Sequence, residues 1–424
     1  MLIKVALVNK LVVYHKKGKS MENNIKKLVC GCMIGSMLLT VPLAGNAYFC
    51  NTAQATSIQK TVNLLQKNTN EEIIKTLNVK ANNLVLMDAN SGTVLLSRNS
   101  DTPLPMASMT KMMTLLIVME EAEKGVIDIN KTTRISEYSA SQEGSECFLD
   151  ANKEYNITEL IKSVAVASAN DSAVALAELV SGSEEVFARK MNERAKELGL
   201  KNTHFVNATG LDVDGHYSTC EDLAILIKEL NKYDLVKRLS KTWMYDMVHS
   251  DNRVTNLTNT NRLVRTNPEI VLAKTGHTDN AGFCISALGE KNGLGLVAVV
   301  MGEKTSADRF GDVVKLLNYG FANYTSVKVI DKNTPIKEID VVGGKQNKVL
   351  VYPETDLYYL AKKDEVIIKD ISEIIEPKIN APITKDSALG ELKVRINDSE
   401  FSVKLVSRED VEKKTYIDYV KELM

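Results

Sequence analysis

One segment decides the fold: Pro105-Met106-Ala107-Ser108-Met109-Thr110-Lys111-Met112-Met113-Thr114-Leu115-Leu116-Ile117-Val118. Its apolar residues occupy all sides of a helix rather than one stripe, which indicates a helix that is buried all round. We predict that this helix runs from Ser108 to about Glu123 and is ended by Gly125. Such a helix needs other elements packed around it, so the segment should lie at the centre of a domain.

The elements predicted around this helix are both strands and helices. A turn at Asn90-Ser91-Gly92 separates two apolar strands, and Asn292-Gly293 is a tight hairpin turn between two more. Thr158 is predicted to cap a helical region that is interrupted near Ser168. The predicted strands are Leu84–Asp88, Thr93–Ser97, Val271–Lys274, Phe283–Leu288 and Leu294–Met301, and the predicted helices are Glu159–Leu179, residues 184–198 and Arg309–Tyr324. This order predicts an α+β fold in the broad α/β class, with helices packed on an antiparallel sheet.

Beyond about Thr325 the sequence changes to short β-type segments separated by turn residues, which predicts a small all-β domain. Its predicted strands are Val327–Ile330, Lys348–Tyr352, Glu365–Ile368, Glu391–Ile396 and Phe401–Leu405. The predicted division of the chain is an upstream extension and signal peptide (1–47), a linker (48–80), a catalytic domain (81–324), a β-rich domain (325–406) and a C-terminal amphipathic helix (407–424).

The N-terminus has the pattern of an export signal. Met21 begins a stretch with Lys26 and Lys27, an apolar run from Leu28 to Leu43, and small residues up to Ala47. We predict translation from Met21, cleavage after Ala47, and a protein exported to the outer face of the cell envelope. A longer signal or a retained membrane anchor is the alternative interpretation of residues 1–20.

Charge and cysteine content exclude several function classes. The 424 residues contain 53 Lys and Arg against 54 Asp and Glu, so no basic excess points to a nucleic-acid partner. The six cysteines show no paired spacing for a disulfide framework or a zinc site, and we expect no metal or cofactor. Two histidines also receive structural interpretations: His204 is expected to pack beside Phe205, and His216 is expected to be exposed in a loop.

Ser108 and Lys111 lie three residues apart, so on a helix their side chains share one face. Acyl transfer by serine needs a hydroxyl nucleophile with a base beside it. Lys111 can be that base only when neutral, and burial together with a second nearby cation would lower its pKa. The same pattern occurs at Ser57-Ile58-Gln59-Lys60, which we interpret as surface linker.

Two further motifs follow in order. Ser168-Ala169-Asn170 interrupts a helical region with polar groups that need partners. Lys274-Thr275-Gly276 ends a strand and offers a cation, a hydroxyl, and a glycine that lets a substrate backbone approach. Two rival triplets, Ser97-Arg98-Asn99 and Ser250-Asp251-Asn252, are rejected on their positions in the chain.

The three motifs resemble those of penicillin-binding proteins and serine β-lactamases. More specifically, the chain resembles the low-molecular-mass D-alanyl-D-alanine carboxypeptidases over roughly residues 80–320. Further stretches that carry the resemblance are Leu86-Met87-Asp88-Ala89-Asn90-Ser91-Gly92, Asn202-Thr203-His204-Phe205, Gly210-Leu211-Asp212 and Lys274-Thr275-Gly276-His277-Thr278. The resemblance implies the serine β-lactamase/penicillin-binding fold, and the β-rich domain fits the family's layout.

The resemblance also implies a role for each site residue. Ser108 would attack the carbonyl between two D-alanines of a peptidoglycan stem peptide, Lys111 would accept its proton, and Ser168 would relay a proton to the leaving D-alanine. Substrate binding is implied for Asn170, Lys274, Thr275, Gly276, His277 and Thr278. Within that set Lys274 and Thr275 would hold the terminal carboxylate, and the N–H groups of Ser108 and His277 would form the oxyanion hole. β-Lactam antibiotics would acylate Ser108 in the same way.

Two other functions remain open from the sequence. A class A β-lactamase would need a glutamate before Leu230-Asn231, and Ile227 occupies that position. A non-catalytic wall-binding or sensor protein on the same fold is the other alternative, although all catalytic positions are filled.

The C-terminal segment Glu409–Met424 is predicted to be an amphipathic helix in the place where the family contacts the membrane. Its charge is unsuited to anionic lipids, because five acids (Glu409, Asp410, Glu412, Asp418, Glu422) outnumber three lysines (Lys413, Lys414, Lys421). We therefore predict weak or lost peripheral contact with the membrane.

Overall fold

The computed structural model describes residues 69–423. The predicted signal peptide, the rival Ser57-Ile58-Gln59-Lys60 sequence and most of the predicted linker lie outside the described residues. No helix within residues 69–423 is long and apolar enough to cross a membrane.

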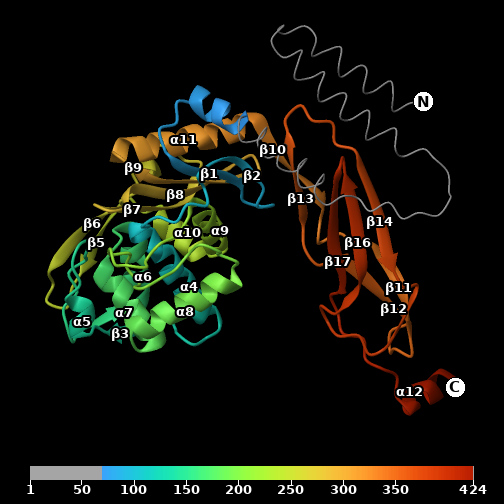
Figure 1. The fold of residues 1–424 in the computed structure, drawn as a ribbon. Coiled ribbons are helices and arrows are strands. Elements are labelled where there is room, and N and C mark those ends of the chain that lie inside the picture. The colour runs from blue at the N-terminus through green and yellow to red at the C-terminus, as the bar shows by residue number, and fades with distance from the viewer. Residues whose placement is uncertain (1–68, 424) are drawn as a thin grey trace, which may run out of the picture. The chain divides into compact units, whose positions relative to one another are not determined.

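A five-stranded antiparallel sheet forms the middle layer of the first domain (Figure 1). Its strand order is β2 (Val94–Arg98), β1 (Asn83–Asp88), β9 (Leu294–Glu303), β8 (Gly282–Lys291) and β7 (Ile270–Thr278). The predicted hairpin turn is confirmed, since Asn292 and Gly293 both have positive φ, 51° and 80°. All the predicted strands of this domain are present, and β7 extends through Thr278 rather than ending at Lys274.

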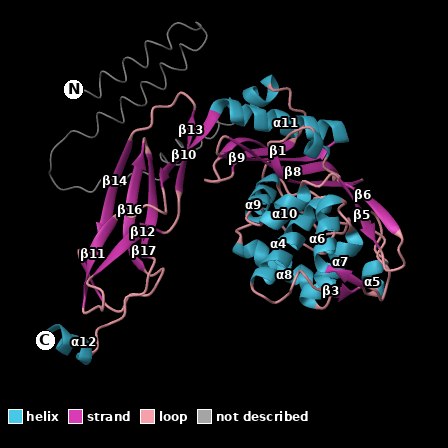
Figure 2. Ribbon diagram, turned by 180° about the vertical axis from the view of Figure 1, so that it is seen from behind, coloured by secondary structure: helices cyan, strands magenta, loops and turns pink. Residues whose placement is uncertain are grey.

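Each face of the sheet contacts its own hydrophobic cluster. Along β9, Val297, Val299 and Met301 face one cluster, while the alternate residues Leu296, Ala298 and Val300 face the other. Helix α11 (Ser306–Asn323) covers the second face, and the helices between residues 107 and 240 gather on the first, as Figures 1 and 2 show. The predicted antiparallel sheet flanked by helices is therefore confirmed.

The central helix is also confirmed, with a modified start. Ala107–Thr110 form a short 3-10 turn, and α4 continues from Lys111 to Glu123 with nearly every side chain buried. Around it lie α5 (Glu137–Ala140), α6 (Ile157–Val166), α7 (Asn170–Ser181), α8 (Glu184–Glu197), α9 (Cys220–Leu230) and α10 (Asp234–Ser240), the hairpins β3–β4 (Thr132–Arg134, Glu154–Asn156) and β5–β6 (Met244–Val248, Val254–Thr258), and a 3-10 turn at Arg262–Arg265.

Two local predictions are corrected. The N-cap of α6 is Asn156 rather than Thr158, because the Asn156 side chain accepts the N–H groups of Thr158 and Glu159. The last part of the predicted linker is corrected: residues 69–76 form the short helix that the sequence predicts at Glu71–Leu77, and this helix belongs to the domain. Ile74 on this helix is fully buried in the cluster under α11, so its apolar side chain joins the domain core.

The C-terminal domain consists of a six-stranded sheet and a two-stranded one (Figure 1). The larger has the order β14 (Lys369–Ile375), β16 (Ala388–Ile396), β17 (Ser399–Ser407), β12 (Lys348–Pro353), β11 (Lys337–Val342) and β15 (Lys378–Asn380). The smaller pairs β10 (Tyr324–Ile330) with β13 (Leu357–Lys362). The predicted all-β character is confirmed, but the strand predicted at Glu365–Ile368 is wrong, since pairing with β16 begins only at Lys369.

The predicted C-terminal helix is shorter than expected. Helix α12 covers only Tyr416–Leu423. Val411 instead exchanges backbone hydrogen bonds with Ile383 and is buried in the core of the β domain. The segment before Tyr416 is therefore extended, because tertiary pairing of Val411 outweighs its helical periodicity.

Candidate active site

Ser108 lies in the 3-10 turn before α4, directly beside Lys111. The Lys111 Nζ atom is 2.9 Å from the Ser108 Oγ and also donates to the backbone oxygen of Thr209 at 2.7 Å. Lys111 is fully buried, whereas Ser108 is half-buried and accessible. The preceding residue, Ala107, has a φ of 48°, a left-handed conformation that costs energy for a residue with a side chain.

The surroundings of Lys111 favour its neutral form. Burial, and then the positive charge of Lys274, hold the pKa of Lys111 well below its usual value. A neutral amine that donates one N–H to Thr209 keeps a lone pair for the Ser108 hydroxyl proton. The geometry therefore suits proton transfer from Ser108 to Lys111.

The second and third motifs meet at Ser168 and Lys274. Ser168 connects α6 to α7 with a φ of 63°, and its Oγ accepts a hydrogen bond from the Lys274 Nζ at 2.7 Å. Both side chains are buried, and burial together with the nearby Arg309 charge lowers the pKa of Lys274 to about 7. Thr275 follows on β7, with its hydroxyl donating to the Thr260 hydroxyl at 2.7 Å.

Asn170 begins α7 and contacts a loop. Its backbone N–H donates to the Ser145 oxygen at 2.6 Å, and its side-chain Nδ2 donates to the Glu143 oxygen at 2.5 Å. The adjacent Asp171 is fully buried and accepts the N–H groups of Cys147 and Leu149. The start of α7 thus holds the loop over residues 143–149 in place.

Gly276 also has a packing role that the sequence analysis did not predict. A Cβ at this position would lie 2.8 Å from the Met106 oxygen and 3.2 Å from the Ser108 nitrogen. The glycine is therefore needed so that β7 can approach the turn that carries Ser108.

The last two predicted residues lie farther along β7. The exposed imidazole of His277 stacks on the Phe283 ring with centroids 4.0 Å apart. Thr278 donates its hydroxyl to Asp212 at 2.9 Å. The structure therefore brings Ser108 to Lys111, Ser168 to Lys274 and Gly276 to the Ser108 turn, while His277 and Thr278 contact Phe283 and Asp212.

Arg309 at the start of α11 is a site residue that the sequence analysis missed. Its buried guanidinium donates to the Gly276 oxygen at 2.9 Å and to the Cys284 oxygen at 3.3 Å. It therefore fixes two neighbouring strands at the third motif and supplies the charge that lowers the pKa of Lys274. A lone arginine in a helix gives no sequence signal of this contact.

The histidine predictions are corrected. His216 is buried, with its Nε2 atom 2.7 Å from the Thr110 Oγ1, because the loop folds it under the Ser108 turn. His204 is the exposed one, and its ring lies against Tyr217 rather than Phe205. Phe205 packs edge-on against His216 instead.

The rival triplet Ser250-Asp251-Asn252 lies in the exposed turn of the β5–β6 hairpin. Within the described residues, Cys147, Cys220 and Cys284 are buried and free, and no group of three or more His, Cys, Asp or Glu side chains is arranged to hold a metal.

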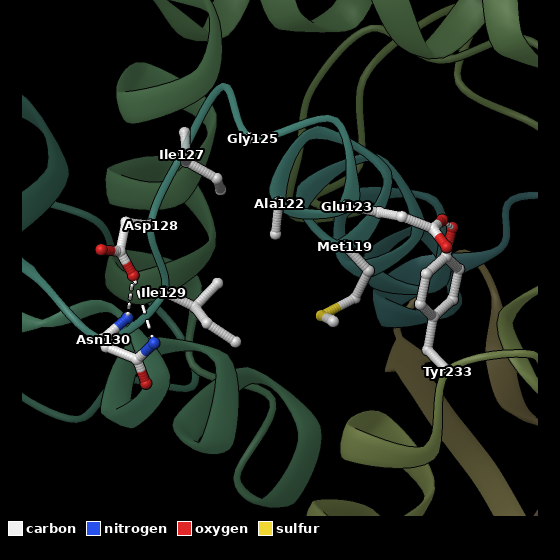
Figure 3. A pocket seen from close by; sticks show the side chains of 9 residues that line it. All are labelled: Met119, Ala122, Glu123, Gly125, Ile127, Asp128, Ile129, Asn130 and Tyr233. Atoms are coloured by element: carbon white, nitrogen blue, oxygen red, sulfur yellow. Dashed lines mark hydrogen bonds between the residues drawn. The ribbon is translucent and has the colours of Figure 1, made fainter.

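A separate pocket of about 450 Å³ lies at the end of α4 opposite Lys111 (Figure 3). Its lining is formed by Met119, Ala122, Glu123, Gly125, Ile127, Asp128, Ile129, Asn130 and Tyr233. Two of these, Asp128 and Asn130, are hydrogen-bonded to each other. None of the predicted site residues contributes to this lining.

Comparison with known proteins identifies the family of this chain. The family model described as D-alanyl-D-alanine carboxypeptidase matches residues 67–305, and the model described as penicillin-binding protein 5, C-terminal domain, matches residues 324–413. The D-alanyl-D-alanine carboxypeptidase DacF of Bacillus subtilis is 36% identical over 94% of this chain and 98% of its own length.

Two further relatives extend the comparison. The D-alanyl-D-alanine carboxypeptidase DacC of Escherichia coli is 31% identical over 81% of this chain and 87% of its own length. The crystal structure of penicillin binding protein 5 from Haemophilus influenzae is 30% identical, covers 79% of this chain and 98% of that chain, and has a TM-score of 0.65. The chain therefore belongs to the D-alanyl-D-alanine carboxypeptidase family, the S11 peptidases, and has the penicillin-binding fold with a C-terminal all-β domain.

Proposed function

We propose that this protein is a serine hydrolase that removes the terminal D-alanine from peptidoglycan stem pentapeptides through an acyl-enzyme on Ser108. The observation that carries the proposal is the accessible Ser108 hydroxyl 2.9 Å from a fully buried lysine whose pKa is lowered. An accessible nucleophile beside a desolvated base is the arrangement that acyl transfer by serine requires.

The reaction begins when the Ser108 oxygen attacks the carbonyl between the two D-alanines and its proton passes to the neutral Lys111 amine. The negative charge that develops on the carbonyl oxygen is stabilised by the N–H groups of Ser108 and His277. Collapse of the intermediate breaks the peptide bond, and Ser168 relays a proton to the departing D-alanine nitrogen. Water then hydrolyses the ester, which regenerates Ser108 and releases the shortened peptide.

The two buried lysines have different charges and therefore different roles. Two cations close together in a buried site disfavour each other, so the site favours one neutral lysine and one charged lysine. Lys274, with a pKa lowered only to about 7, carries the charge and binds the terminal carboxylate together with Thr275. Asn170, Gly276 and Thr278 complete the substrate-binding edge along β7 and the start of α7.

β-Lactam antibiotics carry a strained amide and a carboxylate, so the same groups bind them and Ser108 opens the ring. We further propose that the protein is exported and acts at the outer face of the cell envelope. Helix α12 has three exposed apolar side chains, Tyr416, Ile417 and Val420, which are available for weak peripheral contact with a membrane.

To test the proposed function, the purified protein is incubated with a stem pentapeptide, and free D-alanine and the tetrapeptide are detected by mass spectrometry. The wild type should release D-alanine, and Ser108→Ala should reduce the rate at least about 10³-fold. Ser57→Ala and Ser250→Ala are matched controls, because each changes a serine of a rival motif, and both should keep full activity.

Penicillin distinguishes the alternatives. A carboxypeptidase should form a long-lived penicilloyl adduct on Ser108. Fast, sustained penicillin turnover without release of D-alanine would identify a β-lactamase instead. A folded wild type that neither releases D-alanine nor becomes labelled would identify a non-catalytic binding protein.

A further inference from the structure

Ala107, directly before the proposed nucleophile, has an unfavourable backbone conformation that the surrounding residues must maintain. Its φ is 48°, and its side chain is almost fully buried. A Cβ on Gly210 would lie 1.9 Å from the Ala107 oxygen, so the loop after Phe205 packs directly on this carbonyl. The conformation of the Ser108 turn therefore depends on what this loop presents to it.

A chain of hydrogen bonds connects the loop to the Ala107 carbonyl. The Thr110 hydroxyl donates to the backbone oxygen of Ala107 at 2.8 Å. The same hydroxyl oxygen, Oγ1, lies 2.7 Å from the His216 Nε2. At the other side of the ring, the His216 Nδ1 accepts the Val206 N–H at 3.0 Å. Thr110 and His216 are both buried, so water does not compete for these bonds.

The partners determine the direction of every bond. A backbone N–H can only donate, so the His216 Nδ1 carries the lone pair and the Nε2 carries the proton. The Thr110 hydroxyl has one proton, which goes to Ala107, so its oxygen must accept from His216. Burial lowers the pKa of His216 to about 4, which keeps the ring in this neutral tautomer at physiological pH.

The Ala107 carbonyl and the Ser108 N–H belong to one rigid, planar peptide unit and point to opposite sides of it. Holding the carbonyl toward Thr110 therefore aims the N–H away from the loop. The Ser108 nitrogen lies on the side of Gly276, where β7 passes the turn. Resting on the proposed function, in which this N–H is an oxyanion donor, we propose that His216 and Thr110 are positioning residues that orient the Ala107–Ser108 peptide for catalysis.

The central test compares Thr110→Val with Thr110→Ser. Valine keeps the shape of the side chain and removes the hydroxyl, whereas serine keeps the hydroxyl. Thr110→Val should lower the rate constant of Ser108 acylation by about 10- to 100-fold with little change in KM, because misaiming one oxyanion donor costs less than removing it. Thr110→Ser should recover most of that loss.

Thr114→Val is the matched control. Thr114 is equally buried in α4, and its hydroxyl donates at 2.7 Å to the oxygen of Ala208 in the same loop, whereas the Thr110 hydroxyl donates to the oxygen of Ala107. This variant should lose similar stability and acylate at the wild-type rate. Equal losses of acylation rate in Thr110→Val and Thr114→Val would overturn the proposal in favour of a purely structural role.

A double-mutant cycle tests whether His216 acts through Thr110. His216→Leu should lower the acylation rate without raising KM, and combining it with Thr110→Val should add almost no further loss, because both changes break one chain. Losses that multiply would contradict the chain. Penicillin labelling of the wild type and of Thr110→Val separates the two proposals, with Ser108→Ala as the unlabelled control. A wild type that is not labelled refutes the proposed function. Normal labelling rates in both the wild type and Thr110→Val refute only the positioning role.

Discussion

The two domains differ in how many charged side chains they bury. The catalytic domain buries several of them, namely Asp88, Lys111, Glu121, Asp171, Asp222, Lys274, Glu303, Arg309 and Asp312. In the described part of the C-terminal domain, Ser407 is the sole buried polar residue, and ion pairs such as Lys345–Glu412 and Arg395–Glu400 lie at the surface.

This difference in buried charge follows from the different roles of the two domains. Burying a charge costs free energy that good packing alone would avoid, so an ordinary sheet domain keeps its charges in water. In the catalytic domain, burial of Lys111 and Lys274 has this cost, and the same burial lowers the pKa values of both lysines. Perturbed pKa values that coincide with three convergent motifs indicate catalysis rather than a structural ion network.

The largest expected effect is that of removing the buried base. Lys111→Met should lower the rate of penicillin acylation by about 10³-fold or more while the melting temperature stays the same or rises, because a buried polar amine is replaced by an apolar side chain of similar length. Lys111→Arg should be equally inactive, since a guanidinium does not become neutral. Lys345→Met, at the surface of the C-terminal domain, should change neither quantity. An active Lys111→Arg variant would show that Lys111 is not the base.

The pH dependence should separate the two buried lysines. Activity should rise as Lys111 loses its proton and fall above about pH 7 as Lys274 loses its own, because carboxylate binding needs the cation. The falling limb of kcat/KM should approach a tenfold loss per pH unit. Lys274→Arg should be slower overall and lack that limb up to pH 10. A falling limb that persists in this variant would assign it to another group.

Two glycines provide the next comparison, because a Cβ would collide with backbone oxygen at each. At Gly276 the contact is 2.8 Å to the Met106 oxygen, and at Gly344 in the β domain it is 2.7 Å to the Gln346 oxygen. Gly276→Ala and Gly344→Ala should each destabilise the protein by about 1–3 kcal/mol. Only Gly276→Ala should also lower the acylation rate, by about tenfold. Equal activities in the two variants would mean that β7 tolerates displacement beside Ser108.

A smaller effect is expected from the buried pair Glu303 and Asp312. Burial and the Asp312 charge raise the pKa of Glu303 to about 7, while Asp312 stays charged and accepts the N–H groups of Lys80 and Ala81. Because the folded-state pKa of Glu303 lies above its unfolded value, the associated stability is present below about pH 4.5 and is lost as pH rises through 7.

Glu303→Gln cannot ionise, so it should melt like the wild type near pH 4 and several degrees higher at pH 8. Thermal melts of the two proteins across this range provide the measurement. A difference in melting temperature that does not depend on pH would exclude Glu303 as the titrating group.

The smallest effect belongs to the surface of the C-terminal domain. Arg395 and Glu400 form an ion pair at 2.5 Å, but both side chains are more than 60% exposed. Arg395→Ala should change stability by no more than about 0.5 kcal/mol in denaturant melts, because water screens the pair. A loss above about 1 kcal/mol would show that the contrast between the domains is weaker than their burial suggests.

Local sequence patterns were sufficient for many elements. The all-apolar segment after Lys111 produced the buried α4, and Asn292-Gly293 produced the hairpin between β8 and β9. The incorrect predictions concern segments whose secondary structure depends on a pairing partner elsewhere in the chain. Residues 365–368 have β-type side chains but no strand opposite them, and Val411 pairs with Ile383 instead of continuing a helix.

The sequence by itself determined the order of the three motifs, the sheet-and-helix class and the family resemblance, because each depends on residues close together in the chain. Only the tertiary structure decided why Gly276 is glycine, that His216 is buried, and that Arg309 contacts the third motif. These contacts join segments far apart in sequence, and the chemistry depends on them, since desolvation and charge proximity set a lysine pKa and exist only once those segments pack together.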